Sequence, residues 1–465
     1  MNRTGQTPKA PLRSEIVVLG SDDPATFRNE LSRLAAFLAA APEARLCDIA
    51  FTCATESAGK PFKVAIVATS PEDLAEKLQF ATERIEAGVV RNSFNRGIYV
   101  GTGQCPAPGR TVFLFPGEGT QYPDMMRELA LHFPACRAAF DAADTAVASV
   151  SSDSGAPVWP PPSHYVFPPS QSPQKGFDIR SLPTPLAIQT VLAADTAMLF
   201  LFEQLGIAPD ATMGVGVGEL VALECAGAIQ LPAKRNRIRL LGEGYRLIAE
   251  INANRKSVGD RATFSAAAPS RDFLQKILAS FKDNAIVFAD QTPELFTVSI
   301  ATSARPDVEA ALSAAGITFH PLLSIDKPFH TRLMEPFAHR FHDFYAEFVT
   351  AIPHIPVYSC STRAPITGES PDDIAATAAR QWTTPLDVSG TIHRLYDDGF
   401  RVFVELGARG GLTACVSATL RHLPHLAVAT NRGHRPDLLQ LHHALAALVS
   451  HGANFDPAFL HKERG

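Results

Sequence analysis

Residues 212–219 decide the fold, and they read Thr212-Met213-Gly214-Val215-Gly216-Val217-Gly218-Glu219. A short strand is followed by a glycine-rich turn and by a helix predicted from Val217. This is the layout of a nucleophile elbow, which holds its middle residue in a strained conformation at a helix N-terminus. An attack on a thioester needs Ser or Cys at that position. Here it is Gly216, which accepts the geometry without strain, so the shape is kept while the nucleophile is absent.

A glycine-rich turn between a strand and a helix can also bind phosphate, because the N–H groups of the helix N-terminus face the anion. The glycines here stand at every second position instead of in the order Gly-x-Gly-x-x-Gly, and no ribose-binding acid is evident. Nucleotide binding is therefore the less favoured interpretation.

Apolar strands and long helices surround the turn, as in a parallel sheet covered by helices. The predicted strands are 111–115 (TVFLF) and 401–406 (RVFVEL), and the predicted helices are 186–205 and 438–449. Residues 149–174 are rich in Ser and Pro and are expected to form an irregular surface loop.

Two further units are predicted on either side of the first part of this core. Residues 255–325 follow the order strand, helix, strand, strand, helix, strand of a ferredoxin-like unit. The first hundred residues pair short strands with amphipathic helices, so they form a small α/β unit. Its predicted strands are 15–19 and 63–68, and its predicted helices are 27–41 and 71–87.

The expected fold class is therefore α/β, with a small N-terminal α/β domain and an α/β-hydrolase-like core that carries an inserted ferredoxin-like subdomain. The ligand pocket is expected between core and insertion, under the elbow. The expected units are a flexible tail at 1–14, the small domain at 15–105, the core at 106–254, the ferredoxin-like subdomain at 255–325 and the rest of the core at 326–465.

Composition limits the classes of function. The 465 residues are 46% hydrophobic and 19% charged with a net charge of −5, which indicates a compact protein without the broad basic field that nucleic acid or anionic membranes require. No apolar stretch of signal-peptide type follows the basic start, and the seven cysteines are widely spaced, so we expect a cytoplasmic protein with reduced thiols. His339 and His342 share a helical face without a third ligand, so no metal site and no cofactor are expected.

The elbow and its surroundings resemble the family of malonyl-CoA:acyl-carrier-protein transacylases and polyketide synthase acyltransferases, over nearly the whole chain. That family reads Gly-His-Ser-x-Gly-Glu where this chain has residues 214–219. The frame and Glu219 match, and residues 220–229 (LVALECAGAI) match the helix that follows. Val215 and Gly216 replace the histidine and the serine.

Other segments extend the resemblance. Residues 116–121 (PGEGTQ) are similar to Pro-Gly-Gln-Gly-x-Gln, residues 328–334 (PFHTRLM) to Phe-His-Ser-x-x-Met, and residues 403–407 (FVELG) to Val-Glu-x-Gly. The N-terminal domain resembles the adaptor between ketosynthase and acyltransferase. The Glu118 variant, the loop at 167–169 and the ending at 412–413 are most similar to the polyunsaturated-fatty-acid-synthase branch.

The resemblance implies roles for individual positions. His330 corresponds to the general base, which is here vestigial or water-activating, and Gln381 to the residue that positions it. The backbone N–H groups of Glu118 and Val217 correspond to the oxyanion hole. The implied pocket residues are Val215, Leu241, Gln189 and Phe329.

An arginine of the family pairs with the malonyl carboxylate about twenty-five residues past the serine, as suits a bidentate donor. Ungapped counting places Leu241 there, with Arg239 and Arg246 nearby. An apolar residue at this position disfavours a dicarboxylic acyl group. Cys225 lies inside the following helix and is interpreted as a core residue, not as a substitute nucleophile.

Two functions from different classes follow. The first is a non-catalytic module that binds an acyl carrier protein through its phosphopantetheine arm, a ketosynthase or an acyl-CoA. The second is a hydrolase in which His330 activates water against an acyl thioester. Direct transfer between two bound thiols is a third. Whether the chain is an enzyme stays open at this point.

Overall fold

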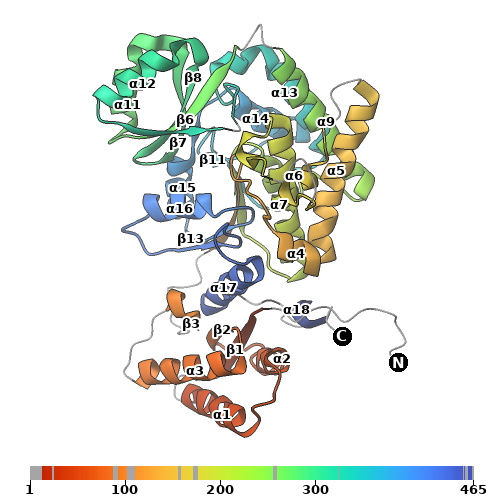
Figure 1. Ribbon diagram of the computed structural model, residues 1–465, viewed down its shortest axis with the longest axis vertical. Coiled ribbons are helices and arrows are strands. Elements are labelled where there is room, and N and C mark those ends of the chain that lie inside the picture. Colours follow the sequence, from red (N-terminus) through yellow and green to blue (C-terminus); the bar gives the residue numbers. More distant parts are fainter. Residues whose placement is uncertain are drawn as a thin grey trace.

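The computed structural model describes residues 13–23, 26–86, 93–101, 110–154, 159–170, 176–254, 259–323, 325–453, 455 and 459–462. These residues form three sheets, each with its own helices (Figure 1). The architecture is α/β, as predicted. The predicted tail at 1–14 lies outside the described residues up to position 12, but Ser14 is buried and its Oγ lies 2.8 Å from His442 Nδ1.

The central sheet places the site. Its order is β11-β10-β5-β4-β13-β14, and its strands are parallel except for β11. The strands are β4 (Arg110–Phe115), β5 (Ala211–Gly214), β10 (Val357–Ser359), β11 (Ala364–Pro365), β13 (Phe400–Glu405) and β14 (Leu426–Ala429). The carboxyl ends of β4, β5 and β13 lie at one edge of the sheet, where open α/β sheets bind their ligands.

Helices cover the two faces of this sheet. They are α4 (Arg127–His132), α5 (Pro134–Ser154), α6 (Pro162–Val166), α7 (Thr184–Gln204), α8 (Gly218–Cys225), α9 (Lys234–Ala253), α13 (Ala338–Phe348), α14 (Pro371–Ala379), α15 (Val388–Asp397), α16 (Gly411–Thr419) and α17 (Asp437–Ser450). The short helix α18 (Phe459–Lys462) packs on the core through Phe459, whose ring stacks on Phe133. Among the described helices α7 alone has the length and hydropathy of a membrane span, but 94% of its apolar window is buried inside the protein.

The structure corrects the loop predicted at 149–174. Helix α5 continues to Ser154, and α6 begins at Pro162, where a proline is tolerated because the first turn of a helix has no use for its N–H. Tyr165 and Val166 of α6 are buried in the core. The Ser and Pro content therefore led to a wrong prediction of a loop over these helical residues. Residues 155–158 and 171–175 lie outside the described part of the chain.

The second sheet has the order β12-β7-β8-β6-β9, in which the last four strands carry the predicted ferredoxin-like arrangement. Its elements are β6 (Arg261–Ala267), α11 (Arg271–Leu278), β7 (Ala285–Thr292), β8 (Leu295–Ala301), α12 (Arg305–Ala314) and β9 (Thr318–Leu322). The fifth strand, β12 (Leu386–Asp387), comes from later in the chain and pairs in parallel with β7. It ties this subdomain to the core and was not predicted.

The third sheet is the antiparallel β1-β2-β3 of the N-terminal domain, with β1 (Glu15–Ser21), β2 (Phe62–Ala68) and β3 (Ile98–Gly101). One face packs on α1 (Phe27–Ala40), α2 (Leu46–Glu56) and α3 (Pro71–Glu86), and α17 from the C-terminal part of the chain lies against the opposite face (Figure 1). Strand alternation sends neighbouring side chains to these two faces. Helix α2 was not predicted.

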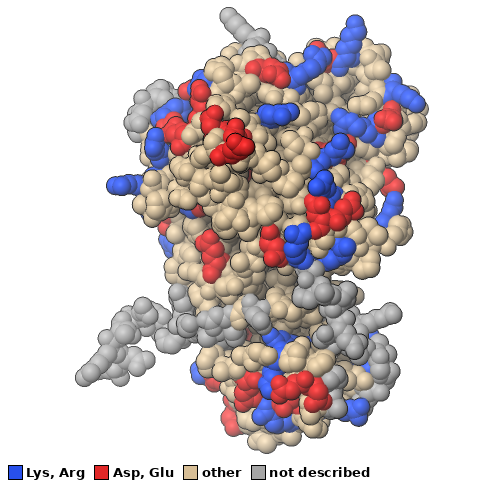
Figure 2. All heavy atoms as spheres, turned by 180° about the vertical axis from the view of Figure 1, so that it is seen from behind, with Lys and Arg blue, Asp and Glu red and all other residues tan. Residues whose placement is uncertain are grey.

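Charges of both signs are interspersed on the face of the molecule in Figure 2. Many charged side chains of the protein form ion pairs with a residue three or four positions away in the chain, such as Arg394 with Asp398 and Arg305 with Glu309. Such exposed pairs contribute little to stability.

Candidate functional site

The predicted elbow lies between β5 and α8. Gly216 has φ +56°, in the left-handed region that glycine accepts readily, and the turn bonds to β4 through Val215 N and Phe115 O at 3.0 Å. A Cβ on Gly218 would lie 2.2 Å from Phe115 O, and one on Gly117 would lie 2.6 Å from Val215 O. Glycines at these positions therefore let the two turns at the sheet edge meet backbone to backbone.

His330 faces the elbow. Its ring is buried between Phe288 and Trp382, with ring centroids 6.1 and 5.6 Å away, and its backbone has φ +62°, a strained value of the kind that occurs at functional sites. Nδ1 lies 2.7 Å from the backbone oxygen of Gln381, which can only accept, so Nδ1 carries the proton and Nε2 is an acceptor. Burial lowers the pKa of His330 to about 4, so the ring is neutral at pH 7.

Gln381 positions His330 through its backbone, while its side chain serves another network. Its Nε2 donates to Glu219 Oε1 at 3.1 Å and to Tyr345 Oη at 3.0 Å, and Ser359 Oγ donates to Glu219 Oε2 at 2.8 Å. Burial raises the pKa of Glu219 to about 8. Glu219 at the start of α8 thus connects the elbow to the segment that holds His330.

The Glu118 side chain lies beside the elbow, next to the predicted oxyanion donors, the backbone N–H groups of Glu118 and Val217, which favour the charged form of its carboxyl group. Its Oε2 has no hydrogen-bond partner and would lie 3.1 Å from a Cβ on Gly216, while His330 Nε2 would lie 3.5 Å from the same atom. Burial raises the pKa of this carboxyl group, and the two N–H groups act in the opposite direction.

A cleft of about 720 Å³ opens over these groups, between the core and the ferredoxin-like subdomain, as expected. Its size is that of a site for a small organic ligand. The core side includes Val215, Gly216 and His330, and the subdomain side includes Phe288 and Thr297. The mouth carries Arg180 and Arg409.

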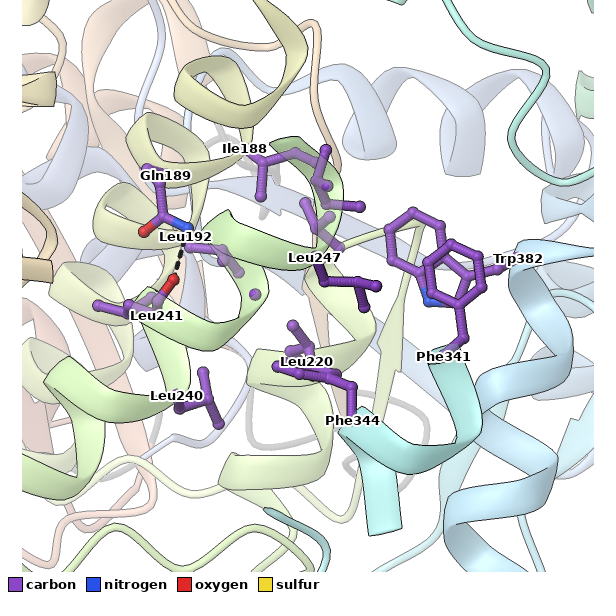
Figure 3. A pocket seen from close by; sticks show the side chains of 13 residues that line it. Ile188, Gln189, Leu192, Leu220, Leu240, Leu241, Leu247, Phe341, Phe344 and Trp382 are labelled. Atoms are coloured by element: carbon purple, nitrogen blue, oxygen red, sulfur yellow. Dashed lines mark hydrogen bonds between the residues drawn. The ribbon is translucent and has the colours of Figure 1, made fainter. Parts of the chain in front are cut away.

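A second, small cavity of about 20 Å³ lies against Val217 and Leu220 at the start of α8 (Figure 3). Leu241 and Gln189 meet there, because Gln189 Nε2 donates to the backbone oxygen of Leu241 at 3.1 Å, and Gln189 Oε1 has no partner. Leucines of α9 and the rings of Phe341, Phe344 and Trp382 complete the wall, and no charged residue is among the described residues that line it.

Neither nearby arginine enters this cavity. Arg239 is exposed and pairs with Glu347, and Arg246 pairs with Glu243 at 2.6 Å on the same helix. Neither arginine therefore takes the place of the malonyl-pairing arginine, and Leu241 remains the residue at that position.

Three other positions singled out in the sequence do not line the cleft. Phe329 is fully buried and contacts Trp382 edge to face at 5.3 Å, and it lines neither the cleft nor the small cavity. A pocket role for Phe329 is therefore wrong; its ring supports the Trp382 ring that packs on His330.

Cys225 packs against the core, as predicted, and burial raises the pKa of its thiol to about 12, so it is a poor nucleophile. His342 lies 3.5 Å from Asp372, and no cluster of three metal-ligating side chains occurs among the described residues.

Sequence reasoning missed a buried carboxyl group beside the site. Asp195 of α7 is fully buried, both of its side-chain oxygens lack a partner, and a Cβ on Gly407 would lie 2.3 Å from its Oδ1. Burial raises the pKa of Asp195 well above its usual range, and the charge of Glu405 adds to this. The interruption of an apolar helix by an acid was the available signal.

Asp195→Asn is expected to raise the free energy of unfolding at pH 7 by about 1–3 kcal/mol. Because the pKa is higher in the folded than in the unfolded state, Asp195 destabilises the protein progressively as the pH rises above the unfolded value of about 4. Urea unfolding of both proteins between pH 4 and pH 8 measures the effect. A variant that is equally stable at pH 4 and less stable at pH 8 contradicts it.

Comparisons with known proteins agree with this geometry. The phenolphthiocerol synthesis polyketide synthase type I Pks15/1 of Mycobacterium marinum is 26% identical over 433 residues, which are 92% of this chain and 18% of that protein. A mycocerosic acid synthase-like polyketide synthase of Mycobacterium tuberculosis is 26% identical over 456 residues, 96% of this chain and 19% of that protein. The chain thus spans about a fifth of the length of these relatives. No family model matches the chain.

Solved structures are similar over nearly the whole chain. The acyltransferase domain from the second module of the salinomycin polyketide synthase is 26% identical with a TM-score of 0.64, covering 95% of this chain and 94% of the other. The acyltransferase domain of ZmaA has a TM-score of 0.75 at 17% identity, with 98% of both chains covered. A malonyl-transacylase solved with its type II polyketide synthase acyl-carrier protein has a TM-score of 0.56 at 20% identity, covering 71% and 98%. The chain has the fold of polyketide synthase acyltransferase domains.

Proposed function

We propose that this chain is an acyltransferase-like module of a polyketide or polyunsaturated-fatty-acid synthase system that binds acyl thioesters without transferring the acyl group. In this proposal residues 15–105 are the adaptor toward a ketosynthase. The cleft between core and ferredoxin-like subdomain receives a phosphopantetheine arm. The acyl carrier protein is the expected source of that arm, because a structural neighbour was solved with such a protein.

One observation carries the proposal: the base of the site faces a position with no side chain. His330 Nε2 would lie 3.5 Å from a Cβ on Gly216, which is the place of a nucleophile, and Gly216 has none. Cys225, in α8, has a raised thiol pKa. Without a nucleophile there is no acyl-enzyme, and loss of the nucleophile from comparable dyads removes several orders of magnitude in rate.

The walls also indicate the class of acyl group. Leu241, at the position counted for the family's malonyl-pairing arginine, lines a small cavity beside the elbow whose other lining side chains are apolar apart from one amide. Glu118 adds a carboxyl group whose buried Oε2 lies over Gly216. The site therefore favours an uncharged acyl group over malonyl.

Hydrolysis with His330 as base is the weaker candidate. A neutral His330 with a free Nε2 has the protonation that such a base needs. The two donors that would stabilise the oxyanion, however, already interact with the Glu118 carboxyl group, whose pKa they act to lower. A preorganised oxyanion hole is usually the largest contribution to such catalysis.

Loss of thioester from acetyl-, malonyl- and longer acyl-CoA tests the two candidates, with the wild-type protein measured beside His330→Ala. We expect both proteins to leave the thioesters at the spontaneous rate. Hydrolysis by the wild type that the variant loses would replace the proposed binding role with an editing hydrolase. A holo-acyl carrier protein titrated into the wild type is expected to bind with micromolar affinity, as transient partners do.

A further inference from the structure

The Glu118 carboxyl group is placed where a substrate oxygen would be stabilised. Its Oε2 atom is buried and has no hydrogen-bond partner, although the residue as a whole is partly exposed, and the backbone N–H groups of Glu118 and Val217 favour the charged form of the carboxyl group. That free oxygen faces the space above Gly216, since of the three elbow glycines Gly216 is the one whose added Cβ has Oε2 as its nearest atom. A buried oxygen without a partner is costly, so a specific arrangement has to maintain it.

The replacement of serine by glycine fits this arrangement. A Cβ at position 216 would come within 3.1 Å of Oε2, a distance tighter than normal contact, and a hydroxymethyl group would need more of the same space. The carboxyl group and a nucleophile at position 216 therefore compete for one volume. The two departures from the acyltransferase pattern, at positions 118 and 216, are coupled by packing.

We propose that the side chain of Glu118 is a built-in ligand of the oxyanion hole, which keeps thioester carbonyl groups out until it rotates away. The inference rests on the proposed function, since the excluded ligand is the acyl thioester of that site. Glu118 then determines selectivity: the cleft holds the pantetheine arm, but the acyl carbonyl gains no hydrogen bonds from the protein.

A role for Glu118 as the nucleophile fits the geometry less well. Attack of Oε2 on a thioester would form a mixed anhydride, with the C–S bond broken and the thiolate released. The negative oxygen formed in that step would need the N–H groups of residues 118 and 217, and these interact with the attacking group itself. These N–H groups are therefore not free to stabilise the oxyanion that an attack by Glu118 would form.

Binding of acetyl-CoA and of free CoA by calorimetry tests the proposal, with wild type, Glu118→Ala and Glu118→Gln compared. In the wild type the two ligands should bind equally, because the carbonyl makes no contact with the hole. In Glu118→Ala acetyl-CoA should bind about tenfold more tightly than CoA, as one or two new hydrogen bonds allow. The preference of Glu118→Gln for acetyl-CoA over CoA should lie between those of wild type and Glu118→Ala, because a neutral amide is a weaker acceptor for the same N–H groups. The matched control is Glu294→Gln, which changes an exposed acid paired with Arg421. Its affinities for the two ligands should be those of wild type.

A second readout does not depend on CoA. In a TROSY spectrum the amide proton of Val217 should move upfield in Glu118→Ala, because its interaction with a carboxyl group is lost, and should stay in place in Glu294→Gln. An unmoved Val217 amide, or equal preference for acetyl-CoA in wild type and Glu118→Ala, overturns the proposal. An acyl adduct on the wild type that Glu118→Ala cannot form also overturns it. If no variant binds CoA or acetyl-CoA, the proposed function fails, and the Val217 amide still decides the role of Glu118.

Discussion

The double variant Gly216→Ser/Glu118→Gln is expected to form a covalent acyl adduct with acetyl-CoA. Serine restores a hydroxyl group beside His330 Nε2, which is already neutral and oriented by the Gln381 carbonyl. The second change weakens the hold of the side chain on the N–H groups of residues 118 and 217. Intact-mass spectrometry over time gives the rate of acylation.

The single variants separate the two effects. Gly216→Ser alone has the nucleophile but meets Glu118 Oε2, so its acylation should be about 10²–10³-fold slower than that of the double variant. Glu118→Gln alone should form no adduct, because glycine remains at position 216. Equal rates for Gly216→Ser and the double variant would show that Glu118 does not obstruct the hole.

Gly218→Ala is expected to lower the free energy of unfolding by more than about 3 kcal/mol, or to prevent folding. The new Cβ would lie 2.2 Å from Phe115 O and 2.6 Å from Pro116 O. Both atoms are backbone at the end of the central strand β4, so no side-chain rotation relieves the clash. Chemical denaturation monitored by circular dichroism measures the loss.

Gly411→Ala is the matched control for this prediction. Gly411 is the first residue of α16, and a Cβ there has no heavy atom within 4 Å. The variant should be as stable as wild type, or more stable by up to about 1 kcal/mol. A Gly218→Ala protein as stable as Gly411→Ala would contradict the close approach of α8 and β4.

Much of the fold could be predicted, because its signals are local. Apolar runs such as 111–115 become central strands, and the strand and helix order of 255–325 matches the observed sheet. Strand β12 could not be predicted, since two residues carry no periodic pattern and pair with a sheet far back in the chain. The prediction missed helix α2, and it placed a loop over the end of α5 because Ser and Pro are frequent there.

The site could be predicted in its positions but not in its contacts. The motifs indicate which residues face the elbow, and His330 and Glu118 do lie there. The sequence predicted the backbone N–H of Glu118 at the pocket and an effect of its charge on carboxylate ligands, but the position of its Oε2 over Gly216 depends on a side-chain rotation that the sequence does not specify. Phe329 was misjudged because its ring packs on Trp382 in the core and does not line the cleft. The unpartnered Asp195 emerges only when α7 and β13 are packed together.

The central claim is that the wild-type protein forms no acyl-enzyme. Its most direct test is the intact mass of the wild type after incubation with acetyl-, malonyl- and longer acyl-CoA, with Gly216→Ser/Glu118→Gln as the positive control. The account predicts an unchanged mass for the wild type under conditions in which the double variant is acylated. A stable acyl adduct on the wild type would contradict it and would reveal a nucleophile in this cleft other than the residue at position 216.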